Sequence, residues 1–328
     1  MHDIASLKTA STEVPSIDAV EAGLVRAGYI PNRQIATALF LSLRLQKPIL
    51  VEGPAGVGKT ELAKAAAEFL GLPLIRMQCY EGLDESKALY EWKYGKQLLY
   101  TQILKDKLGE SFKDTVDLHA AMTRLNSFSD VFFSHDFLEP RPLLRALQQP
   151  GGAVLLIDEI DKADEEFEAF LLEILSDYQV TIPEIGTIEA LVPPVVLLTS
   201  NNTRDLGDAM KRRCLHLHIG YPDQKLEERI IDSRVPHVEA SLRKQLVAFV
   251  QQLRTIDLRK LPSVSETIDW ARALLLMHAN ELEPQVVQDT LNVLLKFEGD
   301  MQTGQRRSAE LVHKARREAG LDMSTAAG

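Results

Sequence analysis

One eight-residue segment restricts the possible folds of this 328-residue chain more than any other. Residues 53–60 read GPAGVGKT and match the pattern GxxxxGK[ST] in full. The apolar run Ile49–Val51 before it predicts a short buried strand, and helical spacing follows over residues 59–70. A strand, a glycine turn and a helix in this order form the context in which such a segment binds phosphate. These flanking elements disfavour a chance glycine-rich turn before Lys-Thr.

We expect the backbone N–H groups of this phosphate loop to converge on phosphate oxygens, where the helix N-terminus adds partial positive charge. Lys59 would reach the β- and γ-phosphates, and Thr60 would coordinate Mg²⁺. The sequence therefore predicts a site for a nucleoside triphosphate with Mg²⁺. The predicted cofactor-binding residues are Gly53, Pro54, Ala55, Gly56, Val57, Gly58, Lys59, Thr60 and Glu61.

Two acidic residues follow a second apolar strand, which is predicted over residues 153–157. A carboxylate at the end of a buried parallel strand faces the crevice where α/β sheets bind ligands. We expect Asp158 to help hold the Mg²⁺ ion and Glu159 to polarise an attacking water. An acid after an apolar strand often marks only the end of that strand, but the phosphate loop about 100 residues upstream favours the functional interpretation.

Polar residues also end a third apolar strand, predicted over residues 195–199. Asn201 is the candidate there for holding the attacking water or the γ-phosphate. It is preferred over Asn202, although Asn-Asn-Thr is also a reasonable turn.

The sequence Lys-Arg-Arg at residues 211–213 ends a predicted short helix and allows two interpretations. Basic residues at a helix C-terminus are favoured by the helix dipole and are often only solvated. Alternatively, Arg212 or Arg213 acts as an arginine finger on the nucleotide of a neighbouring subunit. The residues alone favour neither interpretation, and they leave open which arginine would be the finger.

Composition excludes several classes of protein. The net charge of −10 argues against a dedicated nucleic-acid binder, and two cysteines, Cys79 and Cys214, cannot build a disulfide scaffold. The N-terminus lacks the apolar region of a secretory signal, and no apolar run is long enough to span a membrane. We therefore expect a cytoplasmic protein. His216 and His218 share one strand face, but no third ligand lies nearby, so a structural role is expected.

The order of the predicted elements indicates two folding units. Strands alternate with helices as far as residue 221, which predicts an α/β domain, and only helices are predicted beyond it. The expected divisions are an N-terminal extension over 1–30, an α/β nucleotide-binding domain over 31–221, a helical lid over 222–300 and a helical or flexible tail over 301–328. Other expectations are helices over 96–107 and 284–298, a loop with some helix over 81–92, and a hairpin over 179–190.

These motifs together resemble the AAA+ ATPases, and more narrowly the MoxR group. The resemblance depends on the order of GPAGVGKT, LLIDEIDKAD, the hairpin QVTIPEIGTIEA, LLTSNN, KRRC and the exit GYP, and it covers about residues 30–300. Within the group, CYEGLDESKALYEW and LPSVSETIDWARAL look like the branch associated with maturation of molybdenum-containing carbon monoxide dehydrogenase.

The resemblance implies a P-loop AAA+ core, with a parallel sheet sandwiched by helices, followed by an all-helical lid. It also implies Mg-dependent ATP hydrolysis by a homo-hexameric ring that remodels or activates a client metalloenzyme, with a partner that carries a von Willebrand factor A domain. The loop over 81–92 and the hairpin turn over 183–186 would then face the pore or the client.

The sequence departs from the family pattern at one position and leaves rival functions open. Many members have an arginine at the start of a lid helix, but residues 263–266 read SVSE, and Arg259 is off position. A P-loop small-molecule kinase would share the phosphate loop without needing the lid. A nucleic-acid-associated AAA+ ATPase is disfavoured by the net charge, and a non-hydrolysing scaffold by the presence of Glu159.

Overall fold

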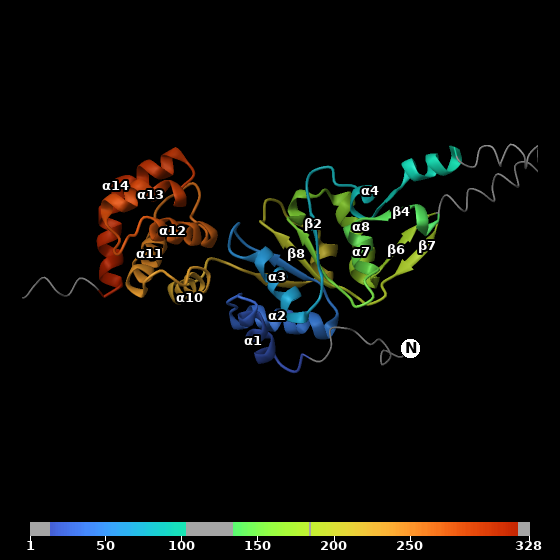
Figure 1. The fold of residues 1–328 in the computed structure, drawn as a ribbon, viewed down its shortest axis with the longest axis horizontal. Helices are drawn as coiled ribbons and strands as arrows, with labels where there is room; N and C mark the ends of the chain where they lie inside the picture. Colours follow the sequence, from blue (N-terminus) through green and yellow to red (C-terminus); the bar gives the residue numbers. More distant parts are fainter. Residues whose placement is uncertain (1–13, 103–133, 184, 321–328) are drawn as a thin grey trace, which may run out of the picture.

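The computed structural model describes residues 14–102, 134–183 and 185–320. A parallel sheet with helices on both faces forms the first part of the fold, and a group of helices follows it (Figure 1). The first part comprises α1 (Ile17–Arg26), α2 (Arg33–Leu45), β1 (Ile49–Glu52), α3 (Lys59–Leu70), β2 (Leu74–Gln78), α4 (Glu85–Ala88), β3 (Tyr90–Trp92), β4 (Leu138–Pro140), α7 (Pro142–Leu147), β5 (Val154–Asp158), α8 (Glu165–Asp177), β6 (Gln179–Ile182), β7 (Gly186–Glu189), β8 (Val195–Ser200), α9 (Asp208–Arg213) and β9 (Leu215–His218). The C-terminal helical region comprises α10 (Gln224–Arg234), α11 (Ala240–Leu253), α12 (Val264–Leu276), α13 (Pro284–Leu294) and α14 (Glu298–Glu318). Short 3₁₀ turns occur at His135–Phe137 and Ile160–Lys162.

The central sheet has five parallel strands in the order β2-β5-β8-β1-β9. Their register aligns the carboxyl ends, with Gln78 beside Asp158 and Glu52 beside Ser200. The fold class expected from the sequence is therefore confirmed. The alignment brings the ends of β1, β2, β5 and β8, which are distant in the sequence, to one edge of the sheet.

Alternating side chains of the buried strands supply two separate apolar cores. On β5, Leu155 and Ile157 belong to the cluster that includes α7 and α8, whereas Val154 and Leu156 belong to the cluster that includes α1, α2 and α3. A strand covered on both faces needs apolar residues at every position, which explains its unbroken VLLI sequence.

Small elements flank the central sheet. The hairpin expected over 179–190 is present as β6 and β7, and Asp164 caps α8 by accepting a hydrogen bond from the Phe167 N–H at 2.8 Å. Part of the loop expected over 81–92 is wrong, because β3 pairs with β4 there in a two-stranded sheet. The sequence signal was weak because β3 has only three residues and its partner lies more than forty residues later.

The predicted limits of the C-terminal helices differ from those in the structure. The helix expected over 284–298 ends at Leu294, and Glu298 begins the separate helix α14. The expected boundary at residue 300 falls inside α14, whose Leu311 and Val312 are buried in the core of the C-terminal helical region. The helix expected over 96–107 is present over 94–102, and its remaining residues lie outside the described part of the chain.

The N-terminal limit differs in the same way, because the expected extension over 1–30 includes helix α1. Val20 and Leu24 of α1 are buried in the same core as α2 and α3. Gly23 allows the close approach, since a Cβ atom there would lie 2.1 Å from the Phe69 ring. Cys79 is buried and Cys214 partly buried, and neither forms a disulfide.

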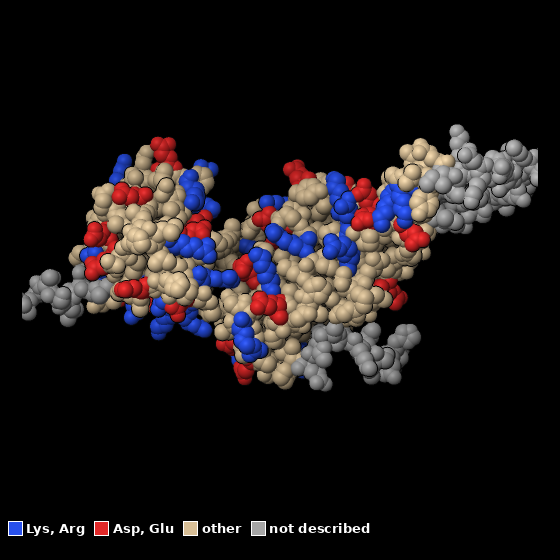
Figure 2. Space-filling model, in the orientation of Figure 1, with Lys and Arg blue, Asp and Glu red and all other residues tan. Residues whose placement is uncertain are grey.

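The surface mixes charges of both signs. On the described part of the face shown in Figure 2, basic and acidic side chains are interspersed over both parts of the fold. Within the described residues, no helix combines the length and apolar character needed to cross a bilayer.

The C-terminal helical region has its own core, centred on Trp270 of α12. Its indole ring is fully buried, lies 5.3 Å from the Phe249 ring between centroids, and donates a hydrogen bond to Thr290 Oγ1 at 2.8 Å. A capping box starts α12, since Ser263 and Glu266 bond each other's backbone. This region therefore has a packed interior separate from the two cores of the sheet.

We expect Trp270→Ala to destabilise the protein by about 3–5 kcal/mol, because it leaves a large cavity and removes the hydrogen bond to Thr290. Urea denaturation followed by circular dichroism measures the loss. Leu276→Ala on the same helix is the control, because Leu276 is 81% exposed and its truncation should change the stability little. Equal effects of the two substitutions would contradict the assignment of Trp270 to the core.

Candidate active site

The phosphate loop requires glycine at two positions where the chain approaches other groups closely. Gly53 has φ 150° and Gly56 has φ 75°, both in the region that favours glycine. A Cβ atom on Gly53 would lie 2.0 Å from the carbonyl oxygen of Ile219, and one on Gly56 would lie 2.2 Å from Ser263 Oγ. The loop is thus wedged between the segment after β9 and the start of α12.

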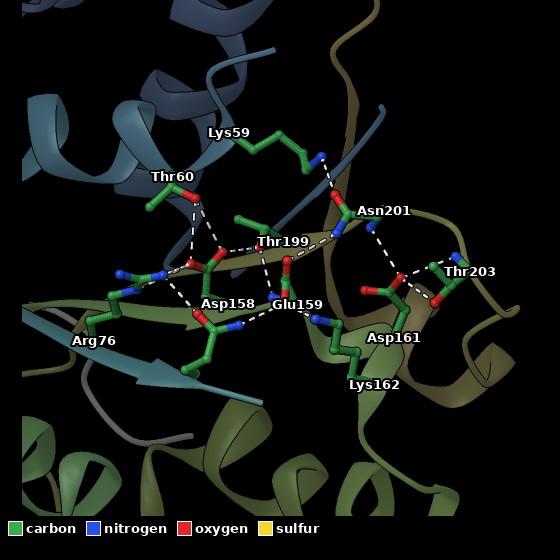
Figure 3. Close-up of polar contacts among 11 residues, drawn as sticks. Lys59, Thr60, Arg76, Asp158, Glu159, Asp161, Lys162, Thr199, Asn201 and Thr203 are labelled. Carbon is green, nitrogen blue, oxygen red and sulfur yellow. Dashed lines mark hydrogen bonds and ion pairs between the residues drawn. The ribbon is translucent and has the colours of Figure 1, made fainter. Parts of the chain in front are cut away.

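Lys59 is held over the loop by three acceptors. Its ammonium group donates to Gly53 O at 2.6 Å, Pro54 O at 2.8 Å and Asn201 Oδ1 at 2.8 Å. Burial lowers the pKa of Lys59, and the neighbouring carboxylates, Asp161 first, oppose this shift. The contact with Asn201 links the phosphate loop to the end of β8 (Figure 3).

Asp158 is buried at the end of β5 and is surrounded by donors from three elements. Thr60 Oγ1 lies 3.2 Å from its Oδ1, and Thr199 donates to the same oxygen. Arg76 of β2 donates to Oδ2 through Nη2 at 2.6 Å and Nε at 3.1 Å. The predicted pair Thr60 and Asp158 is therefore brought together, and its hard oxygen donors suit Mg²⁺.

Glu159 begins the turn after β5 in a left-handed conformation, with φ 58°. A non-glycine residue in this region stores backbone strain, which is common at functional sites. Its N–H donates to Thr199 Oγ1 at 2.9 Å, so one threonine hydroxyl orders both Asp158 and Glu159. Its carboxylate accepts hydrogen bonds from Gln78 at 2.8 Å and Asn201 at 3.2 Å, and it pairs with Lys162 (Figure 3).

Asp161 anchors the turn that carries Asn201. Its Oδ2 accepts from the N–H of Asn201 at 3.2 Å, and from the N–H and the hydroxyl of Thr203 at 3.0 and 2.6 Å. Burial raises the pKa of Asp161, but these hydrogen bonds outweigh it, so the pKa lies below its ordinary value. Asn201, the preferred candidate, therefore lies beside Lys59 and Glu159, whereas Asn202 has a left-handed backbone with φ 57°.

Sequence reasoning did not identify the supporting residues of the site. These are Arg76, Gln78, Asp161, Lys162 and Thr199, which contact Asp158, Glu159 or Asn201. One signal was available for Thr199, because it is a polar residue that follows four apolar ones in β8. Another was the alternation of Arg76 and Gln78, which puts both side chains on one face of β2.

Arg212 and Arg213 are not part of this cluster. Arg213 donates to Ser176 Oγ and, at 3.2 Å, to the Ala209 carbonyl of its own helix. Arg212 is exposed, and no hydrogen bond or ion pair is recorded for it within the described part of the chain. His216 pairs with Glu52, and no cluster of three metal-ligating side chains occurs among the described residues.

A cavity of about 500 Å³ lies beside the phosphate loop. One wall consists of Tyr29 and the loop residues 56–58, and another of residues 219–222 after β9. The third wall belongs to the C-terminal helical region and includes Ser265 and Arg272 of α12. This wall is bonded to the core from Ser265 N and Oγ to Gly56 O, at 3.2 and 3.3 Å, and from Arg234 Nη2 to Glu61 Oε2 at 3.0 Å.

The fold and site define a P-loop nucleotide-binding protein. Residues 48–214, slightly more than half of the chain, match the family described as AAA domain (dynein-related subfamily). The chain belongs to this family, and it is accordingly an ATPase of the AAA+ class.

The chain is also similar to other proteins and to solved structures. Uncharacterized proteins of Staphylococcus aureus strains NCTC 8325 and COL are each 28% identical over 247 residues, which cover 73% of this chain and 79% of theirs. The Thermotoga maritima RuvB Holliday junction branch migration motor is 16% identical with a TM-score of 0.43, covering 80% of this chain and 67% of that chain. A mutant RuvB structure is 16% identical with a TM-score of 0.45, covering 85% and 72%.

We expect Asp161→Asn to destabilise the protein by about 1–3 kcal/mol at pH 7, because it weakens the bonds to the Asn201 turn. The pKa of Asp161 is lower in the folded than in the unfolded state, so its stabilisation is present above the unfolded pKa of about 3.9. It is lost as the pH falls through the folded value. Urea denaturation at pH 7 and in this acidic window measures both effects, and a pH-independent difference between the two proteins would contradict the assignment.

Proposed function

We propose that the chain binds ATP with Mg²⁺ and hydrolyses it with a water activated by Glu159. The observation that carries the proposal is the chain of contacts from Lys59 through Asn201 to Glu159, with Asp158 and Thr60 beside it. These contacts support the proposal because a cation for phosphate, oxygen donors for a metal and an ordered carboxylate lie within one cluster. Lys59 and Thr60 belong to α3, Asp158 ends β5, and Glu159 begins the turn after it.

The triphosphate would lie on the N–H groups of the phosphate loop, with the nucleoside in the adjoining cavity. Residues 56–58 belong to the phosphate loop and also line that cavity, so one ligand can contact the loop and fill the cavity. Thr60 and Asp158 would hold the Mg²⁺ ion, which offsets phosphate charge when bound. Lys59 would exchange its contacts with loop carbonyls for phosphate oxygens.

Glu159 is the candidate general base because its carboxylate is ordered by the side chains around it. Asn201 and Gln78 each donate to one of its oxygens, so the group has a fixed direction. Accepting a proton from water as the water attacks the γ-phosphorus is the role that this position allows. Asn201 would orient that water or the γ-phosphate, since it bonds both Glu159 and Lys59.

The test of the ATPase site uses Lys59→Ala and Glu159→Gln. We expect Glu159→Gln to lower turnover by about 100-fold or more while ATP affinity stays nearly unchanged, because only proton transfer is lost. Lys59→Ala should weaken ATP binding as well as hydrolysis. Phosphate release and equilibrium binding of a fluorescent ATP analogue measure the two effects.

Lys64→Ala is the matched control, because Lys64 is an exposed lysine on the same helix and pairs with Glu61. Its activity should stay close to that of the wild type. Hydrolysis that survives undiminished in Glu159→Gln would refute the role of Glu159 as the base. Unchanged affinity in Lys59→Ala would refute the proposed phosphate site.

We infer that the protein acts as a ring, a homo-hexamer, with Arg212 as the finger that reaches the nucleotide of the next subunit. AAA+ proteins commonly form rings, and both arginines are exposed, but Arg213 is bonded to Ser176 and Ala209 of its own chain. An arginine held in this way has less freedom to contact a neighbour.

Mixing two inactive variants tests this inference. Arg212→Ala alone should lose about 10³-fold in turnover, since a guanidinium no longer offsets the phosphoryl charge. Lys59→Ala keeps the finger but lacks the nucleotide site, so mixed rings should regain part of the activity measured as phosphate release. Full activity of Arg212→Ala, or of a strictly monomeric protein, would contradict the inference. Arg213→Ala is the comparison and should have the smaller effect.

The finer assignment depends on the resemblance to the MoxR group. We propose a two-part chain, with the α/β domain ending near residue 221 and a helical lid beyond it, that remodels a client protein complex. Support comes from the motifs at residues 79–92 and 261–274, which look like the branch linked to molybdenum hydroxylase maturation. The client would be such a metalloenzyme, with a von Willebrand factor A domain protein as partner. Identifying the proteins retained by the Glu159→Gln variant with ATP tests this proposal.

A further inference from the structure

A buried ion pair joins two helices of the C-terminal helical region. Glu227 of α10 is fully buried, and the side chain of Arg254, at the end of α11, is only 7% exposed. The guanidinium binds the carboxylate in a two-pronged arrangement, with Nη1 2.7 Å from Oε2 and Nη2 2.8 Å from Oε1. This geometry fixes the orientation of the guanidinium plane.

Further donors fix the carboxylate of Glu227. Gln251 of α11 donates to Oε2 at 2.7 Å, and the hydroxyl of Thr267 on α12 donates to Oε1 at 2.8 Å. Each carboxylate oxygen therefore accepts two hydrogen bonds, which uses the ordinary capacity of the group. Helices α10, α11 and α12 thus converge on a single carboxylate.

The other contacts of this network lead to the wall of the nucleotide cavity. The guanidinium carbon of Arg254 lies 4.8 Å from the centroid of the Tyr221 ring, in a cation–π contact. Gln251 donates to the Pro222 carbonyl at 3.0 Å, and Arg254 Nε donates to the Pro262 carbonyl at 2.8 Å. Tyr221 and Pro222 both line the cavity beside the phosphate loop.

The buried pair of Glu227 and Arg254 is better explained by the position it gives to Arg254 than by a gain in stability. Removing two charges from water costs several kcal/mol per ion, so a buried ion pair is weak evidence of a gain in stability. What the pair in this protein provides is a rigid arginine with one face available to an aromatic ring. The ring belongs to the short segment between β9 and α10, where the chain passes from the sheet to the helices.

We propose that Arg254 is a positioning residue for nucleotide binding, oriented by Glu227 and acting by fixing the Tyr221 ring in the cavity wall. The proposal deepens the proposed function and rests on it, because it requires a nucleotide in that cavity. Tyr221 touches the nucleotide, whereas Arg254 and Glu227 act through it.

The test replaces both charged residues together, in the double variant Glu227→Gln/Arg254→Met. Neither a lone buried carboxylate nor a lone buried guanidinium remains, so the fold is preserved far better than after a single substitution. We expect the Kd of the full chain for ATP carrying a fluorescent N-methylanthraniloyl group to rise about tenfold. Thermal unfolding is measured in parallel to report stability separately.

A matched control removes another ion pair between the same two helices. Arg243 of α11 pairs with Asp232 of α10, neither lines the cavity, and Asp232 is exposed. Asp232→Asn/Arg243→Met should leave the Kd for the analogue within about twofold of the wild-type value. An equal rise in both double variants would overturn the proposal, because it would show a general loosening of the helices.

Substitutions of Tyr221 show whether the ring carries the effect. Tyr221→Leu should raise the Kd about as much as the double variant does, and Tyr221→Phe, which keeps the ring, much less. Adding Tyr221→Leu to the double variant should raise the Kd little further, since both changes remove the same contact between Arg254 and the Tyr221 ring. Additive losses would overturn the proposal, because Arg254 would then act independently of the ring.

The remaining outcomes separate this proposal from the proposed function. Wild-type protein that does not bind the analogue refutes the nucleotide site and the positioning role together. Wild-type binding with an unchanged Kd in a folded double variant overturns only the positioning role. If the double variant unfolds, Arg254→Lys decides the question, because it keeps the charge and loses the planar fork; an unchanged Kd there also overturns the proposal.

Discussion

The alignment of strand ends in the parallel sheet is the constraint on which the rest of the site depends. β1 lies between β8 and β9, and β5 lies between β2 and β8, so their carboxyl ends meet at one edge. Because β1, β5 and β8 are buried on both faces, their apolar side chains fix the register, and the polar residues that end or follow them lie at that edge. Lys59, Asp158 and Asn201 are neighbours for this reason, although more than 140 residues separate the first from the last.

At that edge, supporting hydroxyl and carboxylate groups orient the residues to which we assign the chemistry. Thr199 donates to Asp158 and accepts from the N–H of Glu159, which keeps the strained turn at Glu159 in place. Asp161 does the same for Asn201 through the backbone. Such supporting contacts are required because a catalytic group displaced by about 1 Å loses much of its effect.

The sequence predicts the chemical groups better than it predicts what surrounds them. The phosphate loop, Asp158 and Asn201 follow from local patterns, because each belongs to a strand end with a recognisable apolar run. The sequence did not predict Arg76 and Gln78 as site residues, because their contacts depend on β2 lying beside β5. Local sequence patterns do not determine the order of strands in a sheet. The expected limits at residues 30 and 300 did not take into account that α1 and α14 complete cores formed by distant segments.

The cavity between the two parts of the fold explains why nucleotide binding and the placement of the C-terminal helices cannot be independent. Its walls come from the phosphate loop, from the segment after β9 and from α12, so a nucleotide that fills it contacts all three. The contacts that hold the walls together are few, chiefly Ser265 to Gly56 and Arg234 to Glu61. Because a ligand shifts a conformational equilibrium only by its differential affinity, ATP and its products would favour different helix positions as far as their contacts with these walls differ. Tyr221 and Pro222 join the sheet to the helices, and they contact Arg254 and Gln251 of the C-terminal helical region. On our proposal, a change in the nucleotide would therefore alter the helix positions through this short segment.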